Sequence, residues 1–245
     1  MHKIFTSVLA GVITASVALI GASSAPAAPL VSQSAAPEII GGTKSPATPW
    51  AVQLVYKQAD GKTYSCTGIA IAASWVLTAD HCVSDSVGMT AYYSNSTSNL
   101  GTGITADKLY NSPQGDVALV HLSKPKPLSS YPVVAQSYVT KAGDKGTIYG
   151  YGKRANGAAS DGLYQANNTV TGVGIDLFSA PAIHVKGDNG AANAGDSGGP
   201  LFIGGKIVGI LSLGDVANPG ADIHAGAEYT NVTPIRQWIK NTSGV

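Results

Sequence analysis

Gly195-Asp196-Ser197-Gly198-Gly199-Pro200 places a serine between an acidic residue and a pair of glycines, with a proline closing the run. A serine hydroxyl is a poor nucleophile unless a base lies beside it, and the oxyanion that it generates needs hydrogen-bond donors that are already aimed. The glycines permit backbone conformations in which successive N–H groups point to one spot. The hexapeptide therefore suggests a nucleophile and its oxyanion loop, although alone it also fits a glycine-rich turn.

The composition favours an all-β protein with many turns. Glycine makes up 30 of the 245 residues, against a usual share of about 7%, and Val, Thr, Ser and Tyr are abundant. Charged residues are only 12% of the chain and the net charge is +1, so there is no electrostatic case for a nucleic-acid partner.

The N-terminus has the pattern of a secretory signal. A short basic segment precedes an apolar run over residues 4–20, and Ala25-Pro26-Ala27 offers small residues for cleavage. A transmembrane anchor is the alternative, but the run is short and no charged stop-transfer cluster follows it. We expect a signal peptide at 1–27, a short pro-segment at 28–38 and a folded domain at 39–245. The mature protein is expected to be secreted and extracellular, with no membrane partner.

Short strand signals recur through the folded part without helical periodicity between them, which indicates a sandwich or barrel. Asp60-Gly61 and Gly204-Gly205 are signals for tight turns between strands. The segment 124–130, rich in Lys, Pro and Ser, is the candidate linker between two halves. The expected strands are 51–56, 64–71, 75–78, 117–122, 147–151, 168–173, 201–203 and 206–211.

One helix is expected at the C-terminus, over about 233–242. Thr233 is its candidate N-cap, and Pro234 suits the first helical position. Apolar residues then recur at the spacing of one helical face, so the helix should cover a barrel. These residues are Ile235, Trp238 and Ile239.

The chain has two cysteines, Cys66 and Cys82. An even count in an oxidising compartment argues for a single disulfide. In the chain-entropy model, closing a loop of about 15 residues stabilises a protein by about 3 kcal/mol. A metal site is not expected, because no second Cys or His pair lies at ligand spacing.

Two further segments offer the groups that a serine nucleophile requires. His81 follows an apolar strand and precedes Cys82, so a disulfide would anchor the backbone beside a candidate base. Asp116 opens another apolar strand, where a carboxylate is costly to bury without a partner such as an imidazole N–H. Taken singly, each has a plainer interpretation, as a surface or core histidine and as a solvated aspartate in a Gly-Asp turn.

Together these segments resemble the trypsin/chymotrypsin family of serine proteases, since the histidine, aspartate and serine occur in that family's chain order. The resemblance spans essentially all of residues 39–245. It implies two perpendicular six-stranded antiparallel β-barrels with a C-terminal helix, the first barrel at about 39–128 and the second at about 129–232, with the site between them. Further matching segments are Pro49–Leu54, Trp75–Ala79, Gly150–Gly152, Ile207–Ile210 and Tyr229–Thr230.

By the family mechanism, Ser197 would attack a carbonyl, His81 would take and return the proton, and Asp116 would orient the imidazolium. The N–H groups of Gly195 and Ser197 would form the oxyanion hole, and water would hydrolyse an acyl-enzyme. The resemblance thus implies a serine endopeptidase acting on protein or peptide substrates. The G-x-S-x-G elbow of α/β-hydrolases fits less well, because it needs an acid and then a histidine after the serine, and only His224 follows.

The family also implies activation by cleavage, in which a new N-terminal amine pairs with the aspartate beside the nucleophile. Ile39-Ile40-Gly41-Gly42 resembles that N-terminus, and Asp196 matches its partner. The alternative is that Ile39 begins an ordinary first strand and Asp196 is a turn residue. The departure is Glu38, because family zymogens usually carry Arg or Lys there. We therefore expect an activating protease that prefers Glu, or stepwise trimming of the pro-segment.

For specificity, the resemblance implies an apolar pocket of small or medium size. Ala191 stands at the floor position, where trypsin-type selectivity would need Asp, and Gly214 would leave the mouth open. Asn193 replaces a family cysteine near this loop, and Asp188 is an alternative source of a preference for basic residues. The expected pocket residues are Ala191, Ser212, Gly214 and Ala227.

No metal and no cofactor are expected. Between His81 and Asp116 the only acidic residues are Asp85 and Asp107, a poor fit to the family's calcium loop. A monomer is expected. Two other classes of function stay open: a protease-like binding protein without activity, and a serine esterase that uses the same triad.

Overall fold

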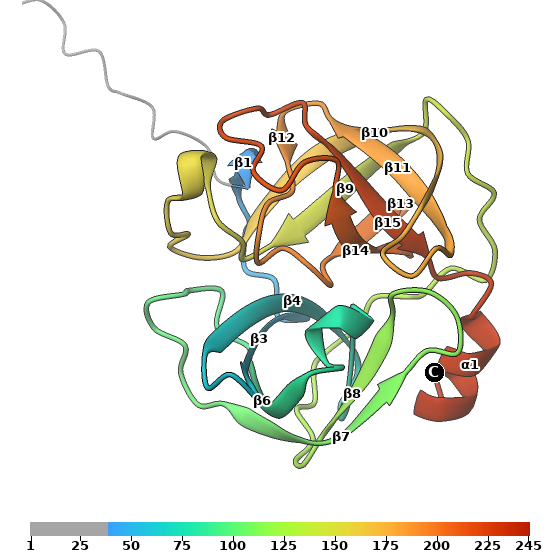
Figure 1. Cartoon of the computed structure of the whole chain (residues 1–245). Coiled ribbons are helices and arrows are strands. Elements are labelled where there is room, and N and C mark those ends of the chain that lie inside the picture. Colours follow the sequence, from blue (N-terminus) through green and yellow to red (C-terminus); the bar gives the residue numbers. More distant parts are fainter. Residues whose placement is uncertain (1–38) are drawn as a thin grey trace, which may run out of the picture. The chain divides into compact units, whose positions relative to one another are not determined.

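The computed structural model describes residues 39–245, so the expected signal peptide (1–27) and pro-segment (28–38) lie outside the described residues. The described chain forms two six-stranded antiparallel β-barrels and a helix after the last strand (Figure 1). This architecture confirms the fold class expected from the sequence. Among residues 39–245, no helix is both long enough and apolar enough to cross a membrane.

The first barrel closes in the order β3-β4-β5-β8-β7-β6. Gly61, in the turn between β3 and β4, has a φ of +78°, a left-handed conformation that glycine adopts without steric cost. Leu54, Leu77 and Leu119 point from three strands into one buried cluster, so the sheet closes around an apolar core. The strands are β3 (Ala51–Gln58), β4 (Thr63–Ala72), β5 (Trp75–Thr78), β6 (Ser86–Tyr92), β7 (Ile104–Asn111) and β8 (Ala118–Leu122).

The second barrel has the order β11-β15-β14-β13-β9-β10 and closes where β10 pairs with β11. Gly204 and Gly205, between β13 and β14, have φ values of +58° and +74°. Two positive values are what a two-residue type I′ hairpin requires, so the expected tight turn is confirmed. The strands are β9 (Lys145–Gly150), β10 (Tyr164–Ile175), β11 (Pro181–Gly187), β13 (Pro200–Ile203), β14 (Lys206–Gly214) and β15 (Gly226–Asn231).

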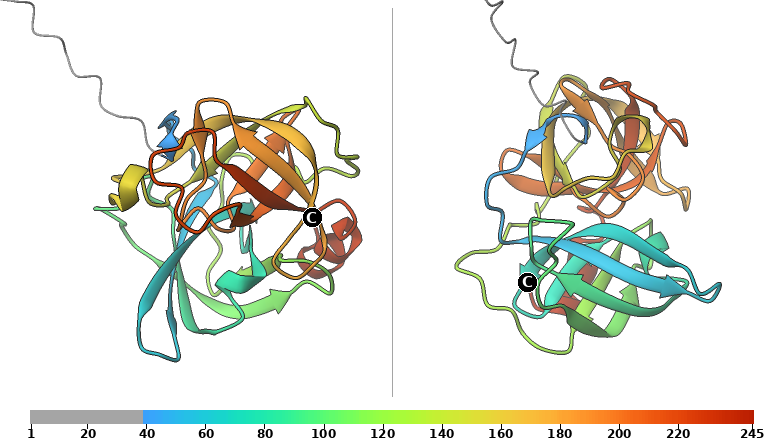
Figure 2. Two further views of the ribbon diagram at one scale, coloured as in Figure 1. Left: turned by 45° about the horizontal axis from the view of Figure 1, so that its top comes forward. Right: turned by 90° about the vertical axis from the view of Figure 1, so that its left-hand side faces the viewer.

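The chain passes between the barrels more than once. It begins on the second barrel, where β1 (Ile40–Gly41) pairs with β12 (Gly190–Ala191) and β2 (Thr43–Lys44) pairs with β10. It then enters the first barrel at β3, as the blue segment of Figure 2 shows. Residues 123–144, which include the expected linker, lead from β8 back to β9.

The C-terminal helix α1 (Arg236–Ser243) begins later than the sequence predicted. Thr233 is not its N-cap, because the amide and hydroxyl of Thr233 both donate to Oδ1 of Asn231 in the preceding turn. Ile235 takes the N-cap position without a side-chain hydrogen bond. Ile235 and Ile239 are buried in the core cluster of the first barrel, so α1 covers that barrel (Figure 1).

Replacing Ile239 with Ala should lower the free energy of unfolding by about 2–5 kcal/mol, because the side chain is fully buried and its loss leaves a cavity. Urea unfolding followed by fluorescence measures the change. Lys240→Ala is the matched control, since Lys240 is exposed on the same helix and should shift the free energy by less than about 0.5 kcal/mol. Equal small effects in both variants would contradict a core role for α1.

Candidate active site

His81 and Asp116 lie at the ends of two paired strands of the first barrel. His81 belongs to the 3-10 turn η1 (Asp80–Cys82) after β5, and Asp116 lies just before β8. Nδ1 of His81 donates to Oδ2 of Asp116 at 2.7 Å, and the His81 backbone N–H donates to Oδ1 at 2.9 Å. Because a carboxylate oxygen accepts, Nδ1 is the donor in this pair, and the opposite ring nitrogen, Nε2, is not engaged by Asp116.

The Asp116 carboxylate is fully buried, and the second barrel helps to hold it. The Ser212 hydroxyl, on β14, donates to Oδ2 of Asp116 at 2.6 Å. The Asp116 N–H donates at 2.8 Å to Oδ2 of Asp176, a second buried carboxylate in the turn between β10 and β11. Each buried carboxylate thus has several donors, as burial of a charge requires. The other donors to Asp176 are the N–H groups of Phe178 and Ala180 and the Thr230 hydroxyl.

Ser197 lies in the loop before β13, where the backbone packs directly on the first barrel. Gly198 has a φ of +80°, and a Cβ there would lie 2.1 Å from Oγ1 of Thr78 and 2.9 Å from the amide nitrogen of Ala79. Only glycine permits so close an approach. Thr78 and Ala79 lead into η1, so this contact brings the serine loop beside the segment that carries His81.

The disulfide between Cys66 and Cys82 joins the two segments that flank this contact, and it confirms the expected pairing. Cys82 lies in η1, and its Sγ is 3.9 Å from the carbonyl oxygen of Ser197. Thr67 follows Cys66 on β4; its N–H donates to the same Ser197 oxygen at 2.8 Å, and its hydroxyl donates to the Gly195 carbonyl at 3.0 Å. The crosslink therefore fixes the histidine segment against the strand that binds the serine loop.

The serine loop presents donors without partners. Gly195 has a φ of +98°, a conformation that turns the backbone at this point. Within residues 39–245, neither the Gly195 N–H, the Ser197 N–H nor the Ser197 hydroxyl makes a hydrogen bond. Two free amides can donate hydrogen bonds to an oxyanion, as an oxyanion hole requires. The free hydroxyl beside them can act as the nucleophile.

Asp196 is buried beside the serine, with neutral partners. Oδ1 accepts the Gly152 N–H at 2.7 Å, and Oδ2 accepts the Asn193 N–H at 2.8 Å. Burial raises the pKa of Asp196 to about 7, and these two hydrogen bonds offset only part of that rise. A nearby cation would lower the pKa again.

Ile39 lies buried where the described chain begins. Its side chain is 1% exposed and packs in the core of the second barrel. Its φ is +51°, a conformation that is strained for a β-branched residue. The next residue, Ile40, pairs with Ala191 in the β1–β12 ladder. The start of the described chain therefore lies against the segment that leads to Asn193 and Asp196.

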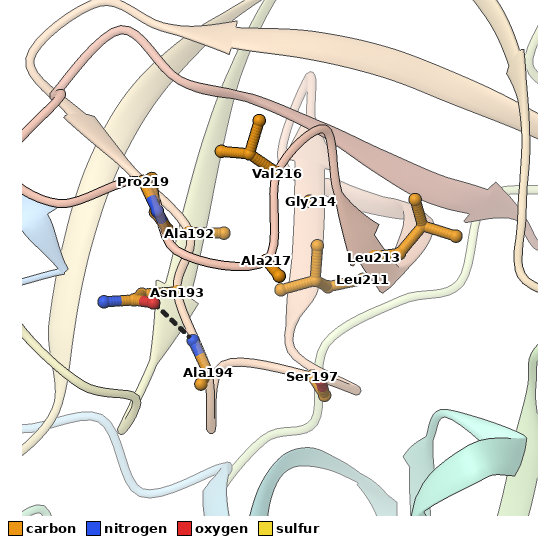
Figure 3. Close-up of a pocket in the computed structure, with 10 residues that line it drawn as sticks. All are labelled: Ala192, Asn193, Ala194, Ser197, Leu211, Leu213, Gly214, Val216, Ala217 and Pro219. Carbon is orange, nitrogen blue, oxygen red and sulfur yellow. Dashed lines mark hydrogen bonds between the residues drawn. The ribbon is translucent and has the colours of Figure 1, made fainter. Parts of the chain in front are cut away.

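A cavity of about 310 Å³ opens beside Ser197 (Figure 3). One wall is formed by residues 192–194, and the other includes Leu211, Leu213, Gly214, Val216 and Ala217. Ser197 lies in the lower half of the view. The lining contains no charged side chain and is mostly small or apolar. The apolar lining residues include Ala192, Leu211, Leu213, Val216 and Ala217.

Of the four expected pocket residues, Gly214 lies on the cavity lining and the other three do not. Ala191 is buried in β12, next to a lining residue. Ser212 is buried between two lining residues, with its hydroxyl on Asp116. Ala227 is buried in β15 and pairs with Gly214. The three residues therefore belong to the strands that support the lining.

The hypothesis that Asp188 reaches the cavity is wrong. Its carboxylate instead accepts hydrogen bonds from Nζ of Lys145 at 3.1 Å and from the Thr169 hydroxyl. Asn193, which replaces a family cysteine, donates from Nδ2 to the Arg154 carbonyl at 3.1 Å. Hydrogen bonding thus tethers this loop where the family has a crosslink.

Sequence reasoning missed Asp176, because an aspartate in a short turn is an ordinary turn signal and its partner Asp116 lies 60 residues earlier. It also missed a group of three side chains in the second barrel that could ligate a metal ion. No local spacing could reveal that group, because its members come from separate elements. They are His184, Asp215 and Glu228.

Comparison with known proteins gives a consistent result. A family profile described as Trypsin matches residues 39–239. An uncharacterized peptidase of Corynebacterium glutamicum is 28% identical over 235 residues, which cover 94% of this chain and 82% of that protein. Human kallikrein-4 is 28% identical over 236 residues, covering 87% of this chain and 90% of that protein.

Solved structures share the fold. The structure titled HL collagenase superposes with a TM-score of 0.70 at 20% identity, covering 83% of this chain and 98% of that chain. Neuropsin, a serine protease of mouse brain, superposes with a TM-score of 0.67 at 23% identity, covering 82% and 98%.

In the uncut chain, the free energy of unfolding should fall as the pH rises from about 4 to about 7. The folded state keeps the Asp196 proton up to a pKa of about 7, whereas an unfolded aspartate releases it near pH 4. The unfolded state therefore binds fewer protons in this window, so the stabilisation present below pH 4 is lost by pH 7. The loss amounts to up to about 4 kcal/mol.

Urea unfolding of the uncut chain in the Ser197→Ala background, measured at several pH values, gives this dependence without self-cleavage. The matched control is the same chain with Asp196→Asn added, because the amide does not titrate. The two proteins should differ in slope between pH 4 and 7. Parallel curves would contradict the raised pKa of Asp196.

Proposed function

The chain belongs to the trypsin family of serine proteases, and on that basis we propose that it is a secreted serine endopeptidase. The observation that carries the proposal is the hydrogen-bonded pair of His81 and Asp116, joined by close packing to a loop with a free serine hydroxyl. The names of the two similar proteins, a peptidase and a kallikrein, support protein or peptide substrates.

We assign Ser197 as the nucleophile and His81 as the general base. As Oγ of Ser197 bonds to the carbonyl carbon, its proton passes to Nε2 of His81. The imidazolium then protonates the leaving nitrogen while the C–N bond breaks, which leaves an acyl-enzyme. Water attacks the acyl carbon by the same route, and the serine regains its proton. The Ser197–His81 hydrogen bond forms with substrate in place, since such bonds are often loose without it.

The buried charge of Asp116 supports this chemistry. It fixes the ring through two hydrogen bonds and stabilises the imidazolium that forms during each proton transfer. The free amides of Gly195 and Ser197 stabilise the oxyanion of the tetrahedral intermediate. Loss of one such donor costs about 10²–10³ in kcat in serine proteases.

The cavity beside Ser197 supports a preference for small or medium apolar residues on the acyl side of the scissile bond. Its lining is uncharged, and Gly214 adds no side chain to its wall. A basic substrate side chain would lose its hydration there without meeting a carboxylate, which is unfavourable.

Two observations support activation by cleavage before Ile39. Asp196 is buried with neutral partners only, within residues 39–245, so a new ammonium group there would find an uncompensated carboxylate. The φ of Ile39 is a torsion that involves the carbonyl carbon of Glu38, so cutting that peptide bond removes the strained torsion. We therefore infer that Ile39 becomes the N-terminus of the active enzyme and pairs with Asp196.

A signal peptide at 1–27 would direct export, and a pro-segment at 28–38 would delay activity until a protease that accepts Glu38 acts. The active enzyme would work extracellularly as a monomer, without a cofactor.

Two other functions use the same scaffold. An inactive, protease-like binding protein would usually have lost a triad member or a glycine of the serine loop, and all are present here. A serine esterase would use the same residues, and turnover of amide against ester substrates separates it from a peptidase.

Intact mass of the secreted protein, before and after treatment with a serine-reactive phosphonate, tests the nucleophile and the activation site together. We expect a mass that begins at Ile39 and a single adduct, because only an ordered oxyanion loop activates Ser197. Ser197→Ala is the matched variant and should take no adduct. A mass beginning at residue 28 with no adduct after prolonged incubation would contradict the proposal.

Gly214→Val should shift the preference of the enzyme toward smaller substrate side chains. A Cβ at Gly214 would lie 3.3 Å from the Val216 carbonyl oxygen, a tight contact that a small shift of this loop relieves, and the added methyl groups narrow the cavity. The ratio of kcat/KM for Leu over Ala substrates should fall by about 10-fold or more. Leu213→Val is the control, because it makes a side chain of the same wall smaller instead of larger. If Gly214→Val leaves the ratio of kcat/KM for Leu over Ala substrates unchanged, the pocket assignment is refuted.

A further inference from the structure

His184, Asp215 and Glu228 come together on the second barrel, outside the catalytic cluster. His184 lies on β11 and pairs directly with Glu228 on β15. Asp215 follows β14, and its N–H donates to the Gly226 carbonyl at 3.0 Å. One ligand atom from each of the three side chains lies within 4.8 Å of the other two. Three neighbouring strands thus direct an imidazole and two carboxylates to one point.

The ring of His184 has a second partner, Thr171, at a β-bulge of β10. The Thr171 hydroxyl lies within hydrogen-bond distance of Nδ1 and, at 3.3 Å, of the carbonyl oxygen of His184. These contacts hold the ring with its other nitrogen, Nε2, facing Asp215.

Without a cation, the three side chains leave one carboxylate oxygen unsatisfied. Nε2 of His184 lies 3.1 Å from each carboxylate oxygen of Asp215. Oε2 of Glu228 is shielded from solvent and has no hydrogen-bond partner among residues 39–245. A proton on Nε2 would satisfy Asp215 but would leave Oε2 of Glu228 without a donor.

The backbone leaves room for these side chains. A Cβ on Gly174 would lie 2.0 Å from Oε2 of Glu228, and a Cβ on Gly226 would lie 2.1 Å from Oδ2 of Asp215. Glycine at both positions therefore makes the space that the three ligands occupy.

We propose that His184, Asp215 and Glu228 bind a divalent transition-metal ion of the zinc type, with water completing the coordination. Ligands bound to one tetrahedral zinc ion at about 2.0–2.2 Å lie about 3.3–3.6 Å apart. The separation between His184 and Asp215 is 3.1 Å, slightly below that range, and the ligand atom of Glu228 lies within 4.8 Å of both, so a rotation of its side chain would complete the set. One imidazole among the ligands selects a transition metal over calcium or magnesium.

The Thr171 hydroxyl acts on the metal through His184. Through its hydrogen bond to Nδ1, it holds the ring in the orientation that presents Nε2, as outer hydrogen-bond partners of metal-binding histidines do. The ion would also tether Asp215, whose neighbours Gly214 and Val216 line the cavity beside Ser197. Binding would thus restrain one wall of that cavity.

Isothermal titration of the chelator-treated, secreted protein with zinc chloride tests the site. We expect one ion per chain, and an affinity reduced by more than about 100-fold in His184→Ala, which loses one of three ligands. Glu228→Gln keeps the shape of the side chain and should also weaken zinc binding. This variant tests the site even if His184→Ala fails to fold. Thr171→Val should weaken it about 10-fold.

Two histidine variants locate the ion. His121→Ala should bind zinc normally, because His121 pairs with Asp107 at 2.6 Å as an exposed pair on the first barrel. His81→Ala should also bind normally, which excludes zinc held by the catalytic histidine. Calcium chloride should produce no binding heat. The proposal is overturned if the protein binds no zinc, if His184→Ala and Glu228→Gln bind as well as the parent, if His81→Ala abolishes binding, or if calcium binds in place of zinc.

Discussion

The buried charge of Asp116 is the constraint on which the centre of the molecule depends. A carboxylate without water must receive donors from the protein. They come from His81 on the first barrel and from Ser212 on the second. Asp176 then holds the Asp116 backbone from a third direction. Moving either barrel away would leave a buried charge without its donors, so the carboxylate couples the position of the catalytic ring to the packing of both barrels.

The glycines of the serine loop complement this polar network with close backbone contact. Gly198 lets the loop approach Thr78 and Ala79, and Gly195 turns the chain so that its amide is left free. Thr67 then fixes the loop by donating to two of its carbonyl groups. Because these contacts are made by backbone atoms, they leave the serine hydroxyl unengaged. The same loop thus combines a rigid position with a reactive group.

The sequence predicted the elements whose signals are local. β5 has the expected bounds, and the glycine-containing turns at 60–61 and 204–205 lie where predicted, because an apolar run or a pair of glycines specifies its own conformation. Four barrel strands, β6, β7, β11 and β15, were not predicted. β7 is largely polar and half-exposed, so it has no apolar run, and β15 is short and interrupted by Glu228.

For the candidate site, short motifs identified the histidine, the aspartate and the serine, and the structure brings their segments together. The motifs did not identify Asp176 or the cavity walls, because those depend on which distant strands become neighbours. Three of the four expected pocket residues proved to lie in strands beside the lining. Spacing along the chain indicates which segment forms a wall, whereas the orientation of each side chain depends on the closed barrel.

The helix α1 is synthesised late but packs in the core of the barrel that is synthesised early. The strands of the first barrel are made first, yet Ile235 and Ile239, near the end of the chain, belong to its core. The core of the first barrel therefore stays incomplete until α1 has been synthesised, long after the strands of that barrel. Loss of α1 would uncover apolar side chains of strands that come before β9 to β15 in the sequence.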